Sequence, residues 1–477
     1  HDRYWLLPAE ERRQRQNDLR ALPVAWAREP AAGELLIYEA QQPPLYYWTL
    51  ALPLMLASNL GLPARVLLLR LFGILLASLA VPLTFAAANR VLSSRKAACM
   101  VTALVAVMPG LMVDICRVGN DSLALPLYSL LLYLAIKFFD DPGKSSIAAG
   151  LGLCLGLGLL TKAYFLAAGL AFALTVAIVV LREPGRRRKI LAHAAFVLAL
   201  VALIAGWWYW RVRASTGTWS GLMQDVELQR IPLFELLRKA PQVDWRSAVD
   251  STFFSHIWFG NWSFLQVRSW MYHYFRGLAL PALLGLVILI AGPWFKRTLS
   301  HPFLACRRHL LVLIAFYASF WLGLLYHVLL TFVANGISSS AGWYLYGVIT
   351  AEVLLFALGL FALIPSPLRD WAVPVATASF GLLDLYTVHF LFIPYYSGLI
   401  SHRANGALAT LVVSRIRSED LWTALVRLQV NKPWESSLVL PLFWVGYLAG
   451  TVALIFIVFR LAKKQCGGWR CDADVDC

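Results

Sequence analysis

The residues best suited to chemistry in this sequence gather in the stretch DICRVGND, at residues 114–121. It holds Asp114, Arg117, Asn120 and Asp121 directly before a long apolar run. A carboxylate can take up a proton, and a guanidinium binds phosphate through paired hydrogen bonds. A plainer interpretation stays open, in which Asn120 or Asp121 caps the next helix and Arg117 extends its charge toward the lipid headgroups.

Two further segments carry polar groups next to apolar runs. Lys162 stands alone in LLTKAYF, where it either reaches for the membrane surface or binds a lipid phosphate. The stretch YEAQQPPLYYW, residues 38–48, places Glu39, Gln41 and Gln42 before two prolines that favour an extended backbone and then a helix start. The alternative for this stretch is a helix entry with an aromatic belt.

Aromatic residues supply the remaining candidates for substrate binding. The segment GWYLY, residues 342–346, begins an apolar run, and aromatics of residues 253–275 alternate with polar residues. Such rings either anchor a protein in the headgroup layer or stack on a sugar. The candidate substrate-binding residues are Gln41, Gln42, Tyr46, Tyr47, Asn120, His256, Trp343, Tyr344 and Tyr346.

The composition indicates that these residues belong to a membrane protein. Of 477 residues 60% are hydrophobic and 14% are charged, against roughly 25% charged in a soluble domain. Apolar runs of the length that spans a membrane recur along the chain. The net charge of +16 resides mostly in short loops between these runs, which is a topology signal and not a nucleic-acid patch. Motifs of nucleotide-binding enzymes and of zinc proteases are absent from the sequence.

The runs predict an all-α polytopic membrane protein with about 11 transmembrane helices. Basic loops near residues 90–96, 182–189, 296–308 and 460–464 fall on one side, which the positive-inside rule assigns to the cytoplasm. Residues 44–60 are then expected to form a re-entrant or surface-lying helix. The expected spans are 65–88, 97–115, 121–139, 145–161, 163–181, 190–209, 278–295, 309–333, 344–364, 371–393 and 439–459.

This topology divides the chain into pieces that alternate between the membrane and its outer face. We expect juxtamembrane helices in the first outer loop, the site in the first membrane half, and amphipathic helices in the second outer segment. The predicted pieces are an outer loop at 1–64, membrane helices at 65–209, a large outer loop at 210–277, membrane helices at 278–393, an outer amphipathic segment at 394–438, a last helix at 439–465, and a tail at 466–477.

The order of these motifs resembles the GT-C superfamily of membrane glycosyltransferases, in the branch of protein O-mannosyltransferases and aminoarabinose–lipid A transferases. The stretch at 38–48 looks like that family's Pro-containing helix entry, and Arg117 with Asp121 resembles its second outer turn. LLTK at 159–162 and GWYLY at 342–346 are also similar to segments of that family. One departure concerns the family's catalytic acid, which is expected early in the first outer loop. Asp2 is a candidate for it; otherwise the acid and a twelfth helix are expected upstream of His1.

The resemblance implies an inverting transferase of a bacterial-type plasma membrane, acting on the extracytoplasmic face on a sugar carried by a polyprenyl phosphate. Glu39, Asp121 and Asp2 are then candidates for the catalytic carboxylates, and Arg117 and Lys162 for binding of the donor phosphate. A divalent cation is optional, and no metal ligands are predicted. The alternative is a noncatalytic GT-C-like subunit or lipid-binding scaffold with partners in a membrane complex. Membrane lipids, and no nucleic acid, are the other expected partners.

Overall fold

The computed structural model describes residues 3–21, 42–228, 231–260, 263–291, 307–430, 432–434 and 436–463. Helices hold most of these residues and none of them forms a strand, apart from one isolated bridge between His402 and Leu408. The predicted all-α class is therefore confirmed. Asp2, Glu39, Gln41 and the tail at 466–477 lie outside the described residues.

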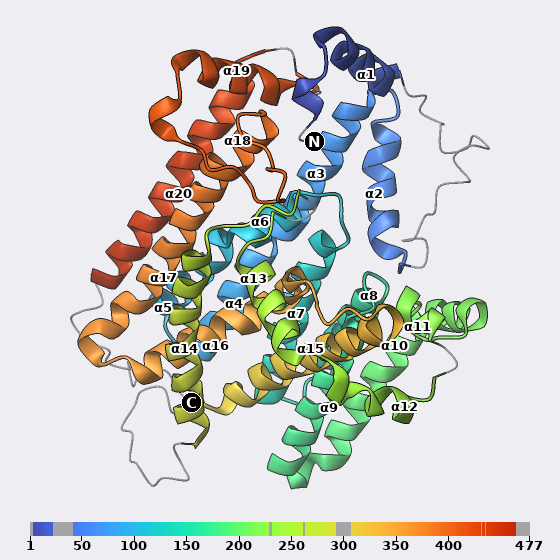
Figure 1. Ribbon diagram of the computed structural model, residues 1–477. Helices are drawn as coiled ribbons and strands as arrows, with labels where there is room; N and C mark the ends of the chain where they lie inside the picture. The colour runs from blue at the N-terminus through green and yellow to red at the C-terminus, as the bar shows by residue number, and fades with distance from the viewer. Residues whose placement is uncertain are drawn as a thin grey trace.

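Helices long and apolar enough to cross a membrane number nine within the described part of the chain, so this is a multi-pass membrane protein. Every predicted span contains helix (Figure 1). The nine are formed by α3 (Leu62–Ser78) with α4 (Ala80–Leu92), α7 (Asp121–Asp140), α9 (Phe165–Arg182), α10 (Arg187–Thr216), α14 (Ser269–Ala291), α15 (Arg307–Asn335), η8 (Gly342–Val348) with α16 (Ile349–Leu363), α17 (Ser366–Tyr386) with η9 (Thr387–Phe392) and α18 (Ile393–Tyr396), and α20 (Val439–Lys463).

One predicted span is broken, and the break helps to build the site. Helices α5 (Arg95–Val107) and α6 (Pro109–Ile115) meet at an angle of 62°. Pro109 provides no backbone N–H, and it disfavours helical geometry at Met108, whose φ of −75° and ψ of 109° are extended. The turn redirects α6 so that it carries the chain into residues 114–121.

Two apolar helices are shorter than a membrane span. Helix α2 (Leu45–Leu56) has 12 residues and α8 (Ser145–Leu159) has 15. Helix α8 packs closely on α10 because Gly152 and Gly156 present no side chain there. A Cβ atom at Gly152 would lie 2.8 Å from Leu200 Cβ, and one at Gly156 would lie 2.9 Å from Ile204 Cβ. This close packing holds in place the turn that follows α8.

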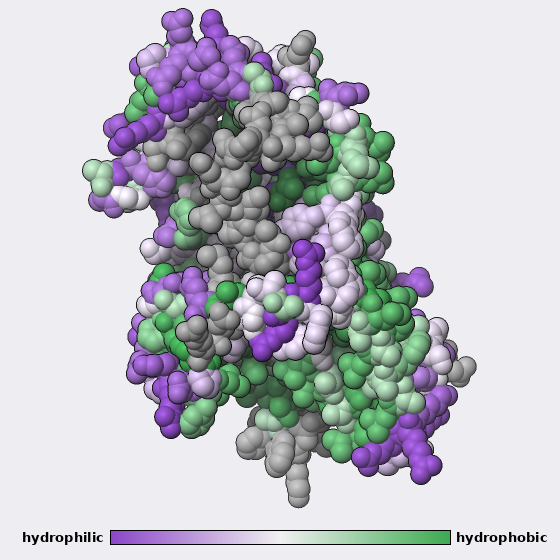
Figure 2. Space-filling view, turned by 90° about the vertical axis from the view of Figure 1, so that its right-hand side faces the viewer, coloured by the Kyte–Doolittle hydropathy of each residue, from purple (hydrophilic) through white to green (hydrophobic). Residues whose placement is uncertain are grey.

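Shorter helices connect the membrane segments: α1 (Ala9–Ala21), α11 (Met223–Glu227), α12 (Leu233–Arg238), α13 (Trp245–Ile257) and α19 (Ser418–Gln429). Helix takes up both ends of the predicted outer loop at 210–277, since α10 runs to Thr216 and α14 begins at Ser269. Figure 2 shows hydrophilic residues gathered at the top of one face, with a continuous hydrophobic surface lower on the right of the view. An apolar flank between polar ends is the surface that a bilayer requires.

Candidate active site

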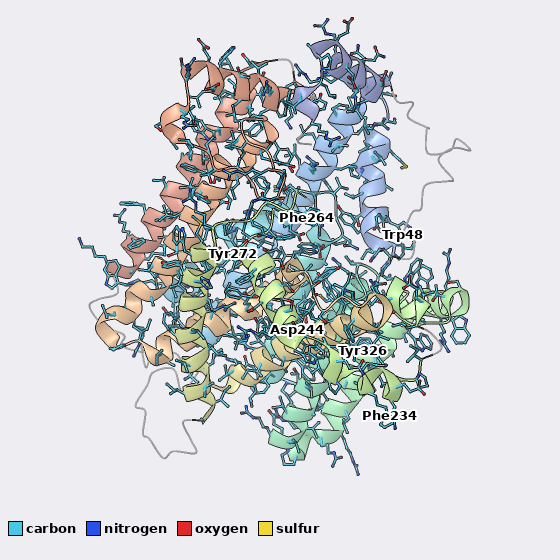
Figure 3. The ribbon with its side chains drawn as sticks, in the orientation of Figure 1. Trp48, Phe234, Asp244, Phe264, Tyr272 and Tyr326 are labelled. Carbon is cyan, nitrogen blue, oxygen red and sulfur yellow. The ribbon has the colours of Figure 1, made fainter. Side chains whose placement is uncertain are left out.

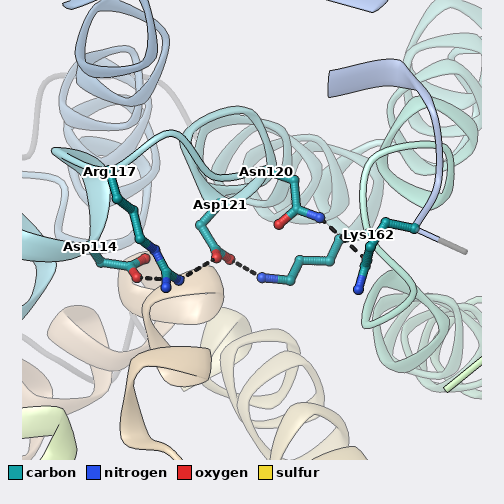
Figure 4. A network of polar contacts seen from close by, with 6 residues as sticks. Asp114, Arg117, Asn120, Asp121 and Lys162 are labelled. Atoms are coloured by element: carbon teal, nitrogen blue, oxygen red, sulfur yellow. Dashed lines mark hydrogen bonds and ion pairs between the residues drawn. The ribbon is translucent and has the colours of Figure 1, made fainter. Parts of the chain in front are cut away.

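The candidate site begins at the turn between α6 and α7, where one arginine contacts two carboxylates. Arg117 Nη2 lies 2.6 Å from Asp114 Oδ1 and 3.2 Å from Asp121 Oδ2 (Figure 4). The kink at Pro109 brings Asp114 to this turn, and Asp121 is the first residue of α7. The local sequence therefore builds a compact cluster of alternating charge.

Lys162 joins this cluster from a distant part of the chain. Its Nζ donates to Asp121 Oδ1 at 2.5 Å, although 41 residues separate the two. Lys162 lies in the turn that follows α8, and its backbone N–H donates to Gly158 O at 2.9 Å. The ammonium also lies 5.1 Å from the ring centre of Tyr164 and 5.7 Å from that of Tyr344, so aromatic faces support its charge. Asp121 thus bridges two cations.

The segment before α2 lies against the same cluster. Leu45 N donates to Leu160 O at 2.9 Å, which ties the start of α2 to the α8–α9 turn. Asn120 makes no side-chain cap of α7; its Nδ2 instead donates to Gln42 Oε1 at 3.4 Å. Asn120 therefore occupies the N-cap position of α7, but its side chain does not cap the helix. Two amide side chains, good partners for hydroxyl groups, lie beside the charged residues.

Burial strengthens the electrostatics of the cluster. The exposed fraction of the side chain is 1% for Asp114, 10% for Asp121, 13% for Lys162 and 25% for Arg117. Burial alone would lower the pKa of Arg117, but the carboxylates of Asp114 and Asp121 outweigh it and raise that pKa. The two cations keep some exposed surface while their counter-ions are almost covered. An incoming anion would therefore meet positive groups first.

Behind the cluster, η8 packs on α13 through buried hydrogen bonds. Gly342 N donates to Ser255 Oγ at 2.6 Å, and the Tyr346 hydroxyl donates to His256 O at 2.6 Å. The ring of His256 lies 2.7 Å from Glu352 Oε1. Burial would lower the pKa of His256, but the Glu352 carboxylate overcomes this and raises it. Tyr346 and His256 thus form a supporting layer.

A cavity of about 430 Å³ adjoins this layer, and Trp343 and Tyr344 line it. His327 also lines it, with its ring centre 5.8 Å from that of Tyr344. Tyr272, labelled in Figure 3 near the middle of the molecule, belongs to the same wall. Because Tyr344 contacts both this cavity and Lys162, it links the cavity to the charged cluster.

The structure thus brings together most of the described candidates predicted from the sequence. Tyr46 is buried at 1% exposure at the start of α2, whereas Tyr47 is 41% exposed. Sequence reasoning placed Asp114 in the polar stretch 114–121 without naming it a candidate site residue, and it gave no role to Glu352. A lone carboxylate inside an apolar span is a known sign of function and could have identified Glu352. The candidates brought together are Gln42, Arg117, Asn120, Asp121, Lys162 and Tyr344.

Comparison with known proteins gives a family match for the first membrane half of the chain. Residues 41–210 match the model of the family described as dolichyl-phosphate-mannose-protein mannosyltransferase, a segment that contains Arg117, Asp121 and Lys162. No curated protein and no solved structure matched the chain. Residues 41–210 of the chain are therefore similar to a membrane glycosyltransferase domain of the GT-C superfamily.

Proposed function

We propose that this protein moves a sugar from a polyprenyl-phosphate donor to a lipid, glycan or protein acceptor on the extracytoplasmic face of a bacterial-type plasma membrane, with inversion at the anomeric carbon. The observation that carries the proposal is the carboxylate of Asp121 bridging Lys162 and Arg117 beside the exposed apolar surface of α2. A lipid-linked sugar needs cations at headgroup level and an apolar path for its chain.

Lys162 and Arg117 suit the phosphate of the donor. An ammonium group has three N–H donors, and Asp121 accepts from one of those of Lys162. The carboxylates hold both cations in place before a substrate arrives, which reduces the ordering cost of binding. The positive charges would also stabilise the phosphate as it leaves with the electron pair of the broken bond.

A carboxylate must take the proton of the acceptor hydroxyl as its oxygen attacks the anomeric carbon. In our proposal the donor phosphate first replaces Asp121 in part of the contact with Lys162 and Arg117. Asp121 then accepts the proton of the acceptor hydroxyl. Glu39 and Asp2 are the other candidates. The bond from the acceptor oxygen to carbon forms while the bond from carbon to the phosphate oxygen breaks, so no further reactant is needed.

The sugar itself is proposed to bind near Tyr344 and Trp343. Aromatic faces stack on sugar rings, and the amides of Gln42 and Asn120 can hydrogen-bond to hydroxyl groups. The cavity of about 430 Å³ lined by the two aromatic residues has the size of a small-ligand site. Tyr46, Tyr346 and His256 are proposed to shape the site from behind.

The test compares donor binding and transfer in purified protein reconstituted into lipid nanodiscs. Lys162→Ala and Arg117→Ala should each weaken the binding of a polyprenyl-phosphate sugar roughly ten- to a hundredfold, because a charge-assisted contact is worth about 1.5 to 3 kcal/mol. Lys144→Ala is the matched control, since Lys144 is 65% exposed and pairs with Asp141. Donor affinity that is unchanged in both site variants would refute the proposal. Tight donor binding without any transfer would point instead to a noncatalytic lipid-binding subunit.

A further inference from the structure

A second basic hollow lies away from the site, between the two polar helices α1 and α19. These helices lie side by side at the top of Figure 1, at the end of the molecule where α20 begins. The hollow has a volume of about 430 Å³. Its side chains include Trp5, Arg12, Arg13, Gln16, Trp422 and Arg427.

Two of its arginines are held against one indole ring. The guanidinium of Arg12 lies 5.6 Å from the ring centre of Trp5, and that of Arg427 lies 4.8 Å from it. Each is fixed by backbone carbonyls, with Arg12 Nη1 donating to Leu7 O at 2.7 Å and Arg427 Nη1 to Ser397 O at 2.7 Å. Burial and the nearby charge of Arg12 both lower the pKa of Arg427. The like charges are therefore close enough to repel each other.

No carboxylate is among the described residues that line this hollow. Three of the five acidic residues of these two helices have partners elsewhere. Glu11 pairs with Arg15 at 2.8 Å, Asp18 accepts from Gln14 Nε2 at 2.8 Å, and Asp420 accepts from the backbone N–H of Arg417 at 2.9 Å. Three arginines that face one space, with no carboxylate beside them among the described lining residues, form a site for an anion.

Apolar side chains beside the hollow indicate what kind of anion would bind there. Leu421, Trp422 and Val426 of α19 are 61%, 63% and 48% exposed. Helix α19 ends at Gln429, and the membrane helix α20 begins at Val439, so the hollow lies close to where the chain enters the bilayer. An amphipathic helix with basic and apolar sides in this position binds lipid. We propose that the hollow between α1 and α19 binds the phosphate headgroup of an anionic membrane lipid, whose chains lie against α19.

The experiment uses the full chain in neutral detergent, titrated calorimetrically with dihexanoyl phosphatidylglycerol below its micellar concentration. Saturable binding is expected, at least tenfold tighter than for dihexanoyl phosphatidylcholine or inorganic phosphate. Arg13→Gln and Arg427→Gln should each weaken it roughly tenfold. Arg13 is the safer variant for folding, because its side chain is exposed. Arg15→Gln on the same helix, 59% exposed, is the matched control and should bind like the parent.

Three outcomes would overturn the proposal. Equal affinity for the two lipids, or full affinity in both site variants, would show that the arginines do not recognise the headgroup. Inorganic phosphate that binds as tightly as the anionic lipid would make the hollow a site for a free anion. The proposal is independent of sugar transfer, because none of its residues belongs to the cluster around Asp121.

Discussion

Gly110 offers the sharpest test of how the site is held. It is the second residue of α6, which delivers Asp114 to Arg117, and it lies directly against the Tyr346 side chain. A Cβ atom at this position would overlap the Tyr346 hydroxyl and would lie 3.0 Å from His256 O. Gly110→Ala must therefore displace either η8 or α6.

The expected cost follows from these contacts. Overpacking of this kind costs about 1 to 3 kcal/mol. Tyr346→Phe alone removes the 2.6 Å bond to His256 O, which costs about 0.5 to 1.5 kcal/mol. In the double variant the hydroxyl is gone, and the new methyl group meets the ring carbon Cζ and His256 O, each at 3.0 Å. The double variant should therefore lose about 1 to 2 kcal/mol less than the sum of the single losses.

The assay is the free energy of unfolding in mixed detergent micelles, with donor affinity measured on the same samples. Gly110→Ala should lower both quantities, since α6 also carries Asp114 of the charged cluster. Gly169→Ala in α9 is the control: no atom lies within 4 Å of a Cβ there, so stability should stay equal or rise by up to about 1 kcal/mol. Strictly additive losses in the double variant would show that Gly110 and Tyr346 do not interact, and would refute the reasoning.

Three further outcomes are expected. Asp121→Asn should reduce turnover more than donor affinity, because Lys162 can still contact phosphate while proton acceptance is lost; equal losses would contradict this. Glu352 raises the pKa of His256, so their pairing stabilises the fold below about pH 6.5 and is lost as the pH rises through the raised value. The melting temperature, measured in thermal scans over a range of pH, should therefore fall more steeply above that pH in the parent than in His256→Gln. Parallel pH profiles of the melting temperature would contradict this prediction. An engineered thiol at Ser220 should react from outside the cell, and labelling from the cytoplasm alone would reverse the proposed orientation.

Local patterns were enough to predict the helices and the polar turn. Each apolar run became helix because a backbone in lipid must satisfy its hydrogen bonds internally, and this requirement depends on composition alone. The segment at 114–121 is short enough for Asp114 and Arg117 to meet through neighbouring turns. The helix break at Pro109 likewise has a local cause, which is the missing N–H of proline.

Contacts between distant segments were decided by the tertiary structure. Lys162 meets Asp121 only because the α8–α9 turn is packed against the start of α7, and hydropathy does not specify which helix lies beside which. In the same way 90 residues separate Tyr346 from the His256 carbonyl that it binds, and Arg427 reaches Trp5 from the opposite end of the chain. The sequence by itself determined which residues lie in the membrane and which polar groups could act. Only the packing of helices, which depends on the shapes of many side chains at once, decided which of those groups meet.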